Sequence, residues 1–436
     1  MTTAAPDRTR PPVTTETDAA PPSRNPVAAW TATIRSALSQ PLTCYYLLLA
    51  SSALLLTIGL IMVLSASSVW SYEHLHGDSY AMAKRQLLWV LIGIPCAYVA
   101  SRLPESALRR MAWPGFLLVL AMLAATQLGA GTSHNGNTNW LGAGPIVVQP
   151  SEIAKLALVV WAAHVYTIKE RLLDDWRHCI VPVVPGLLLA TGLVLWGRDL
   201  GTALVLFAIL LGLLWVVGAP VRLFTFTISA ISVIAIWLAS TDTERRERLL
   251  TFTDPFKDFH HTGWQPAHGL YALSSGGWFG QGIGASQQKW GYLPEAQTDY
   301  IFAVLGEELG LIGTLLVLAL FLTIAYAAVR VALATDRPFV RYVSFGIVIW
   351  LLGQMIINVG MVLALLPVIG IPLPLVSYGG SALVPSLVAL GLLVGFARRE
   401  PEAAAALAAR RRRRSAGLLA GRRGARGKGG TTGWRS

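Results

Sequence analysis

Charged residues are scarce in this sequence of 436 residues, and that scarcity excludes most soluble classes of protein. Asp, Glu, Lys and Arg together make up 13% of the chain, whereas a soluble globular protein carries roughly 25%. Hydrophobic residues make up 54%, and the mean hydropathy is +0.55. This composition excludes a single soluble domain and an intrinsically disordered chain.

Cysteine is equally rare, and familiar nucleotide and metal motifs are missing. The three cysteines, Cys44, Cys96 and Cys179, lie far apart in or beside apolar runs. We expect them to be buried free thiols, because no CxxC spacing or histidine cluster accompanies them. Neither a GxxxxGKS phosphate loop nor an HExxH zinc motif occurs. The sequence therefore predicts no metal site.

The net charge of +12 first suggests nucleic acid as a partner, but its distribution argues against one. Residues 398–436 contain 12 Lys or Arg and two acids, so this segment carries +10 of the +12. The rest of the chain is nearly neutral. A basic segment after the last apolar run is typical of a cytoplasmic tail that contacts anionic lipids. We predict no nucleic-acid partner.

Long apolar runs dominate the middle of the chain and predict an all-α polytopic membrane protein. A helix needs about 20 apolar residues to cross a bilayer. Residues 1–42 are predicted to be a disordered cytoplasmic tail, residues 43–397 a ten-helix membrane domain, and residues 398–436 the basic cytoplasmic tail. The ten predicted spans are 43–66, 86–102, 112–130, 151–168, 179–196, 199–218, 222–240, 299–329, 339–366 and 376–397.

The distribution of basic residues orients these spans. With both termini in the cytoplasm, most Lys and Arg fall in inner loops and tails, including the Arg410–Arg414 run. Two loops then stand out on the outer face. Residues 131–150 are uncharged, rich in Gly and Asn, and contain Trp140. Residues 241–298, between the seventh and eighth spans, are too long and too aromatic for a plain linker.

Several ionisable residues begin the spans that start at this outer face. Glu152 and Lys155 are spaced i,i+3 and can meet on one helix face; Arg198 and Asp199 precede the sixth span, and Asp299 opens the eighth. An ionisable group within a membrane span is a candidate functional residue. The alternative is structural, because acids are favoured in first helical turns and Arg198–Asp199 is compatible with a simple interfacial ion pair. For Glu307 and Glu308, the alternative to a functional role is a structural one, as polar groups packed in the interior of the protein.

The chain resembles the SEDS family of membrane glycosyltransferases that build the bacterial cell wall. The matching segments follow one another in order over residues 45–398: NWLG at 139–142, QPSEIAK at 149–155, DLGT at 199–202, SGGWFGQGIGASQQKWGYLPEAQTDYIFAVLGEELG at 275–310, INVGMV at 357–362 and LLPVIGIPLPLVSYGGS at 365–381. Lys289 followed by YLPEAQTD resembles the division-type member FtsW more than the elongation-type member RodA.

The resemblance implies ten helices and the polymerisation of lipid II into glycan strands at the outer face of the cytoplasmic membrane, at the division septum. It also implies two kinds of partner, a class B penicillin-binding transpeptidase and other divisome proteins. The family's essential acid corresponds to Asp299, which would be the catalytic base. Our candidate substrate-binding residues are Glu152, Lys155, Arg198, Asp199, Lys289, Trp140, Glu307, Ser377 and Tyr378.

The proposed reaction needs a base and a cation. A hydroxyl group of the acceptor sugar must lose its proton, and we expect the helix N-terminus to keep Asp299 ionised for this role. The pyrophosphate leaving group needs positive charge, for which Lys155, Lys289 and Arg198 are candidates. A divalent cation, Mg²⁺ or Mn²⁺, is the alternative. For Lys289 the competing interpretation is a lysine that holds an outer loop in place.

Three positions depart from the family pattern. Asn139 stands where an Arg commonly precedes the tryptophan, Arg198 replaces the usual Pro before DLGT, and Ala382 replaces the second Ser of SYGGSS. The first two changes are compatible with a cation that has moved from one outer loop to the next. Two other functional classes stay open at this point: a flippase for a lipid-linked precursor, and a scaffold that recruits a partner.

Overall fold

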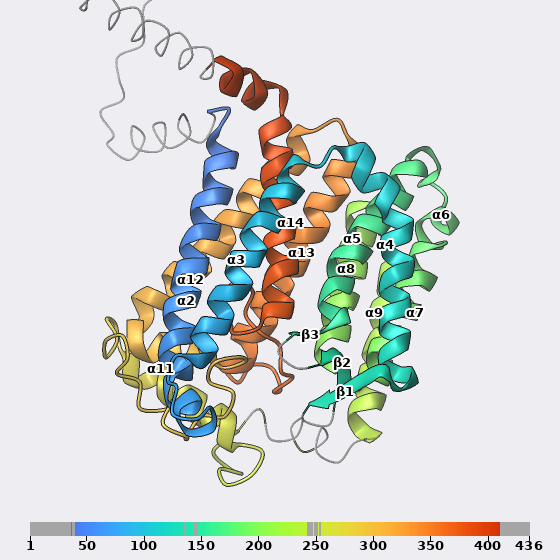
Figure 1. The fold of residues 1–436 in the computed structure, drawn as a ribbon. Helices are drawn as coiled ribbons and strands as arrows, with labels where there is room; N and C mark the ends of the chain where they lie inside the picture. The colour runs from blue at the N-terminus through green and yellow to red at the C-terminus, as the bar shows by residue number, and fades with distance from the viewer. Residues whose placement is uncertain are drawn as a thin grey trace, which may run out of the picture.

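The computed structural model describes residues 40–134, 137–143, 146–241 and 254–409, together with the isolated residues 36, 247 and 252. The described part is a bundle of long helices that run side by side (Figure 1). Most of the predicted N-terminal tail and the Arg410–Arg414 run lie outside the described residues.

Each of the ten predicted spans coincides with a helix. The helices are α2 (Thr43–His74), α3 (Ala81–Arg102), α4 (Glu105–Ala125), α5 (Pro150–Ile168), α7 (Val183–Trp196), α8 (Leu200–Val216), α9 (Val221–Thr241), α12 (Ile301–Ala334), α13 (Pro338–Val362) and α14 (Gly380–Arg399). Within the described residues, seven helical segments are long and apolar enough to cross a membrane, and two shorter apolar helices lie in α8 and α9. The protein is therefore a multi-pass membrane protein, as the composition predicted.

The shorter elements lie at the ends of the long helices and in the loops between them, and the sequence did not predict them as separate elements. A π-helical turn, η1 (Thr126–Ala130), leads into an antiparallel sheet of β1 (Gly131–His134), β2 (Asn137–Ala143) and β3 (Ile146–Val148), in the order β1-β2-β3. The turns η2 (Glu170–Leu172) and α6 (Trp176–Ile180) precede α7, and α11 (Trp264–Gly276) lies in the long loop before α12. The sheet is the one departure from the all-α prediction among the described residues.

Small residues bring the helices of the bundle close together. On α14, a Cβ at Gly391 would collide with the carbonyl oxygen of Ala97, and one at Gly395 with that of Ser101, so α14 packs directly on α3. Such small contacts are a common means of helix association in membranes. Cys44 and Cys179 are buried free thiols as predicted, but Cys96 is exposed on α3, so its predicted burial is wrong.

Helix α12 is interrupted at Gly310, and a loop segment fills the break. Gly310 has a φ of 69°, which a glycine adopts without steric cost. The N–H of Leu311 donates to Gly277 O at 2.9 Å, and the N–H of Gly282 donates to Glu308 O at 3.0 Å. Residues 277–282 therefore pair with the backbone groups that the break leaves free, and they fix the loop against the helix.

The segment between α13 and α14 is not helical. The ninth predicted span extended to residue 366 and the tenth began at 376, whereas α13 ends at Val362 and α14 begins at Gly380. Pro367, Pro372 and Pro374 break any helix here, because proline lacks the N–H and clashes with the preceding turn. This segment, the 363–379 loop, passes beside Asp299.

Candidate active site

Asp299 lies in the turn immediately before α12, outside the helix. Its neighbours are held by the 363–379 loop. The Ser377 hydroxyl donates to Thr298 O at 2.6 Å, and the N–H of Tyr378 donates to Gln297 O at 2.9 Å. Ser377 and Tyr378, predicted as substrate-binding residues, thus contact the backbone of the turn that carries the predicted base.

The carboxyl group of Asp299 is surrounded by protein but keeps partial exposure. Its pKa is raised to about 7, mainly by burial, and the nearby charges of Glu295 and Asp199 contribute in the same direction. The direction is opposite to our expectation from the helix N-terminus, because desolvation outweighs the helix dipole here. Among the described residues its side chain receives no hydrogen bond, so the carboxylate is available to accept a proton.

Asp199 lies close to the same loop from the other side of the site. Its carboxylate caps α8, accepting from Thr202 N and Thr202 Oγ1, each at 2.8 Å. A Cβ at Gly201 would meet Ile371 at 2.9 Å, so the first turn of α8 packs on the loop. Gly370 of that loop faces Asp299, since a Cβ there would lie 3.2 Å from Asp299 Oδ2. The structure therefore brings together two acids that are 100 positions apart.

Glu152 and Lys155 meet on α5 as their spacing predicted. The Lys155 ammonium lies 2.7 Å from Glu152 Oε1, and both side chains are almost fully buried. The ammonium also donates to Gln354 Oε1 at 3.2 Å and lies over the ring of Trp350. The other carboxylate oxygen of Glu152 has no hydrogen-bond partner among the described residues. Lys155 is thus part of an internal ion pair rather than an open anion site.

Lys289 is also committed to an internal network. Its ammonium donates to Gly284 O at 2.7 Å, to Ser65 Oγ at 3.0 Å and to Glu308 Oε1 at 3.2 Å. These bonds connect α2, α12 and the loop before α12. The geometry favours the interpretation that Lys289 holds the loop in place over a role in pyrophosphate binding.

Glu307 lies beside this network and is 1% exposed. Its carboxylate accepts from Ser286 Oγ at 2.5 Å and from Gln287 N at 2.8 Å. Since both oxygens face the loop, Glu307 contributes to loop structure, which agrees with the buried polar alternative.

Of the two outer-loop positions that depart from the family pattern, Asn139 lies against Gly197, the residue that precedes Arg198. A Cβ at Gly197 would collide with Asn139 Oδ1, so the chain before Arg198 passes directly against Asn139. Arg198 is exposed and has a φ of 65°, whereas Asn139 is buried. Trp140 is partly buried on β2, opposite Thr132. The two loops are therefore neighbours, and the exchange of the cation between them stays a prediction.

Two polar residues of α13 that hold the site, Asn358 and Gln354, were not predicted from the sequence. Asn358 donates through Nδ2 to Asp299 O at 2.8 Å and to Ile371 O at 2.7 Å. Gln354, one turn earlier, donates to Pro372 O at 2.9 Å. A signal was present, because an amide within an apolar membrane helix is costly unless it is bonded. Asn358 is part of the INVGMV segment, which was used only to recognise the family.

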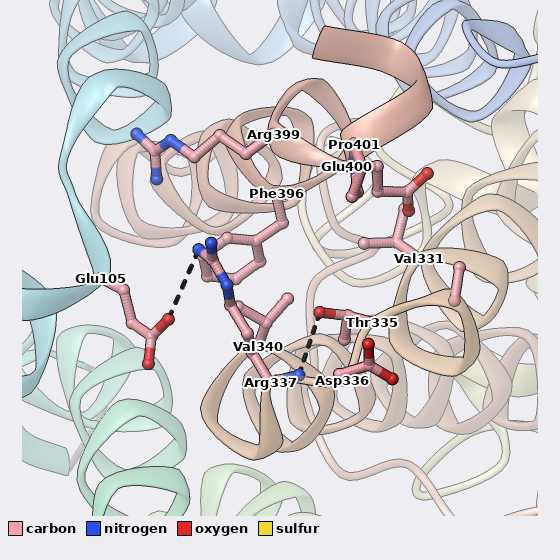
Figure 2. Close-up of a pocket in the computed structure, with 11 residues that line it drawn as sticks. Glu105, Val331, Thr335, Asp336, Arg337, Val340, Phe396, Arg399, Glu400 and Pro401 are labelled. Atoms are coloured by element: carbon pink, nitrogen blue, oxygen red, sulfur yellow. Dashed lines mark hydrogen bonds and ion pairs between the residues drawn. The ribbon is translucent and has the colours of Figure 1, made fainter. Parts of the chain in front are cut away.

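Two further features help to delimit the site. In the part of the chain that the structure describes, no group of three His, Cys, Asp or Glu side chains could hold a metal ion. A cavity of about 260 Å³ lies at the other end of the bundle, where Glu105, Arg337, Phe396, Arg399 and Glu400 are among the residues that line it (Figure 2). None of the predicted site residues lines this cavity.

The chain is similar to known proteins over most of its length. The family model of the cell cycle proteins FtsW, RodA and SpoVE matches residues 45–402. The chain belongs to this family. One relative, "Probable peptidoglycan glycosyltransferase FtsW" of Mycobacterium tuberculosis, is 39% identical over 371 residues, which cover 85% of this chain and 71% of the relative. Another member, stage V sporulation protein E of Bacillus subtilis, is 37% identical over 81% of this chain and 96% of the relative.

Solved structures of the family share this fold. The crystal structure of the rod shape determining protein RodA of Thermus thermophilus matches with a TM-score of 0.59 at 26% identity, and the match covers 81% of this chain and 96% of RodA. A structure of a peptidoglycan synthase complex, concerned with the coordination of polymerization and crosslinking, matches with a TM-score of 0.65 at 27% identity and covers 81% and 97% of the two chains. The SEDS resemblance read from the motifs is thereby confirmed.

Proposed function

We propose that this protein is a peptidoglycan glycosyltransferase of the FtsW type, which polymerises lipid II during septal cell-wall synthesis, with Asp299 as its general base. The observation that carries the mechanism is a partly exposed carboxyl group, with a pKa of about 7, in a turn fixed by the 363–379 loop. The relatives named peptidoglycan glycosyltransferase FtsW, at 35–39% identity, support the activity and the division role.

The base role follows from the chemistry of the acceptor. A sugar hydroxyl is a poor nucleophile until its proton is removed, and a positioned base contributes typically about 10²- to 10⁴-fold to the rate. A base with a pKa near the working pH is the most effective, because enough of it is ionised and it still holds a proton firmly. Asp299 meets both conditions at neutral pH.

The proposed step is a single displacement with inversion. The 4-hydroxyl oxygen of the acceptor GlcNAc forms a bond to the anomeric carbon of the donor MurNAc, and its proton passes to Asp299. The bond from that carbon to the lipid pyrophosphate breaks, and the electron pair leaves with the pyrophosphate. An α-linked donor thus yields a β-linked product, and no covalent enzyme intermediate is required.

The leaving group needs positive charge where it departs. Arg198 is the candidate that the geometry favours, because it is exposed and directly precedes Asp199, the N-cap of α8. Lys155 and Lys289 are enclosed in ion pairs with Glu152 and Glu308, so we assign them to the support of the site. A divalent cation, Mg²⁺ or Mn²⁺, remains the alternative source of charge.

A class B penicillin-binding transpeptidase is the proposed partner, and the septum of the cytoplasmic membrane is the proposed location. The support is the fold shared with the peptidoglycan synthase complex that couples polymerization and crosslinking. We propose that both termini lie in the cytoplasm, where the basic tail would contact anionic lipids and other divisome proteins.

The test is a polymerisation assay with the full-length protein purified in detergent. Labelled lipid II is incubated with the protein, with and without the transpeptidase, and glycan products are separated by gel electrophoresis. We expect polymer, in a larger amount when the partner is present. Lipid movement across proteoliposomes without polymer under either condition would instead establish a flippase.

A further inference from the structure

Asn358 lies near the end of α13 and is completely buried. Both hydrogens of its amide are used: Nδ2 donates to Asp299 O at 2.8 Å and to Ile371 O at 2.7 Å. The orientation of the amide is dictated by these partners, since the reverse orientation would place its oxygen against two carbonyl oxygens. One side chain therefore joins the turn of the base to the loop that passes beside it.

Burying the amide of Asn358 at this position is energetically unfavourable. Its oxygen, Oδ1, is buried and has no hydrogen-bond partner among the described residues. A buried polar atom without a partner is destabilising, because it loses its hydrogen bonds to water and gains none in the protein. An apolar side chain at this position would not have this unpartnered oxygen. The two bonds that Asn358 donates therefore explain why a polar residue occupies the position.

The backbone of the turn is held at three successive points. The carbonyl oxygens of residues 297–299 accept, in order, from Tyr378 N, Ser377 Oγ and Asn358 Nδ2. The first two donors belong to the 363–379 loop, and Asn358 alone provides a bond from a membrane helix. That bond is made at the residue that carries the carboxylate.

We infer that Asn358 is a positioning residue for Asp299, and that it fixes the carboxylate by holding the backbone of Asp299 and the passing loop at Ile371 together. The inference rests on the proposed role of Asp299 as the base. It acts through the backbone, so Asn358 makes no contact with substrate. Gln354 holds the same loop one helical turn away, at Pro372 O, but has no bond to Asp299.

The test replaces Asn358 by leucine, which has a similar shape and no donors. A misplaced catalytic group costs up to about 100-fold in rate, so we expect kcat for lipid II polymerisation to fall about 10- to 100-fold with KM within about twofold. Because burial is the main cause of the raised pKa of Asp299, a loosened turn admits water and lowers it. The midpoint of the rate–pH profile should move to lower pH.

Two matched variants of α13 separate this role from a general loss of structure. Gln354→Leu removes a buried amide bond to the same loop, together with the bonds that Gln354 Oε1 accepts from Lys155 and Trp350, and the pH midpoint should stay at its normal value. Ser344→Ala removes a buried hydroxyl that has no partner among the described residues, and turnover should be unchanged. If Asn358→Leu does not fold, Asn358→Ala removes the same two donors without added bulk or charge.

The inference is overturned if kcat falls only in proportion to the loss of folded protein, measured by thermal unfolding, while the pH midpoint stays in place. It is overturned equally if Gln354→Leu moves the midpoint as far as Asn358→Leu does. Failure of the proposed function looks different, because Asp299→Asn would then polymerise lipid II normally.

Discussion

The raised pKa of Asp299 predicts a steep dependence of turnover on pH. With a pKa of about 7, about one eleventh of the Asp299 carboxyl groups are ionised at pH 6 and about ten elevenths at pH 8. If the ionised form is the base, kcat/KM should rise about tenfold between these values and level off above them. A carboxyl with the ordinary pKa of 3.8 would be ionised at both, and the profile would be flat.

The assay is the initial rate of lipid II polymerisation at low substrate concentration, measured between pH 5.5 and 8.5 in one detergent. Glu295→Gln provides the control, because the Glu295 charge contributes to the raised pKa. In this variant the midpoint should move to lower pH, so the ratio of the rates at pH 8 and pH 6 should shrink. A flat wild-type profile would refute the assignment of Asp299 as the titrating base. So would a pH midpoint that is the same in Glu295→Gln and in the wild type.

Three further predictions follow from packing and charge. Lys155→Met should leave the Glu152 charge buried and unpaired, at a cost of about 3–5 kcal/mol, and adding Glu152→Leu should restore most of the thermal stability; a double variant as unstable as the single one would contradict the pairing. Gly370→Ala should reduce kcat about tenfold, because residue 370 has a φ of 77° and the new methyl group would press on the Asp299 carboxylate; unchanged kinetics would show that the loop yields freely. Burial raises the pKa of Glu400 to about 7 from 4.5, so the folded state binds this proton more tightly and loses stability as pH rises between those values; Glu400→Gln should therefore gain stability over the wild type in thermal unfolding at pH 8 but not at pH 4.5.

The sequence carried most of the membrane architecture. Apolar runs of sufficient length can only be helices in a bilayer, so every predicted span coincides with a helix. The i,i+3 spacing of Glu152 and Lys155 also predicted their ion pair, because the geometry of a single helix fixes that contact.

The remainder depended on tertiary packing that no local pattern encodes. The bonds from Ser377 to Thr298 and from Asn358 to Asp299 join residues 79 and 59 positions apart. The direction of the pKa shift at Asp299 followed from burial, which is a property of the assembled site. From the sequence, Lys289 was a candidate for the anion site, with a lysine that holds an outer loop as the alternative; its ion pair with Glu308 favours the alternative.

Asp299 is proposed as the base for glycosyl transfer, and replacing its carboxylate tests this role directly. Purified wild-type protein and Asp299→Asn are compared in the lipid II polymerisation assay at pH 8, with matched amounts of folded protein and of transpeptidase. The asparagine keeps the shape of the side chain but cannot accept the proton as a carboxylate does. The account predicts a loss of polymerisation of about 10²- to 10⁴-fold, and wild-type activity in Asp299→Asn would contradict it.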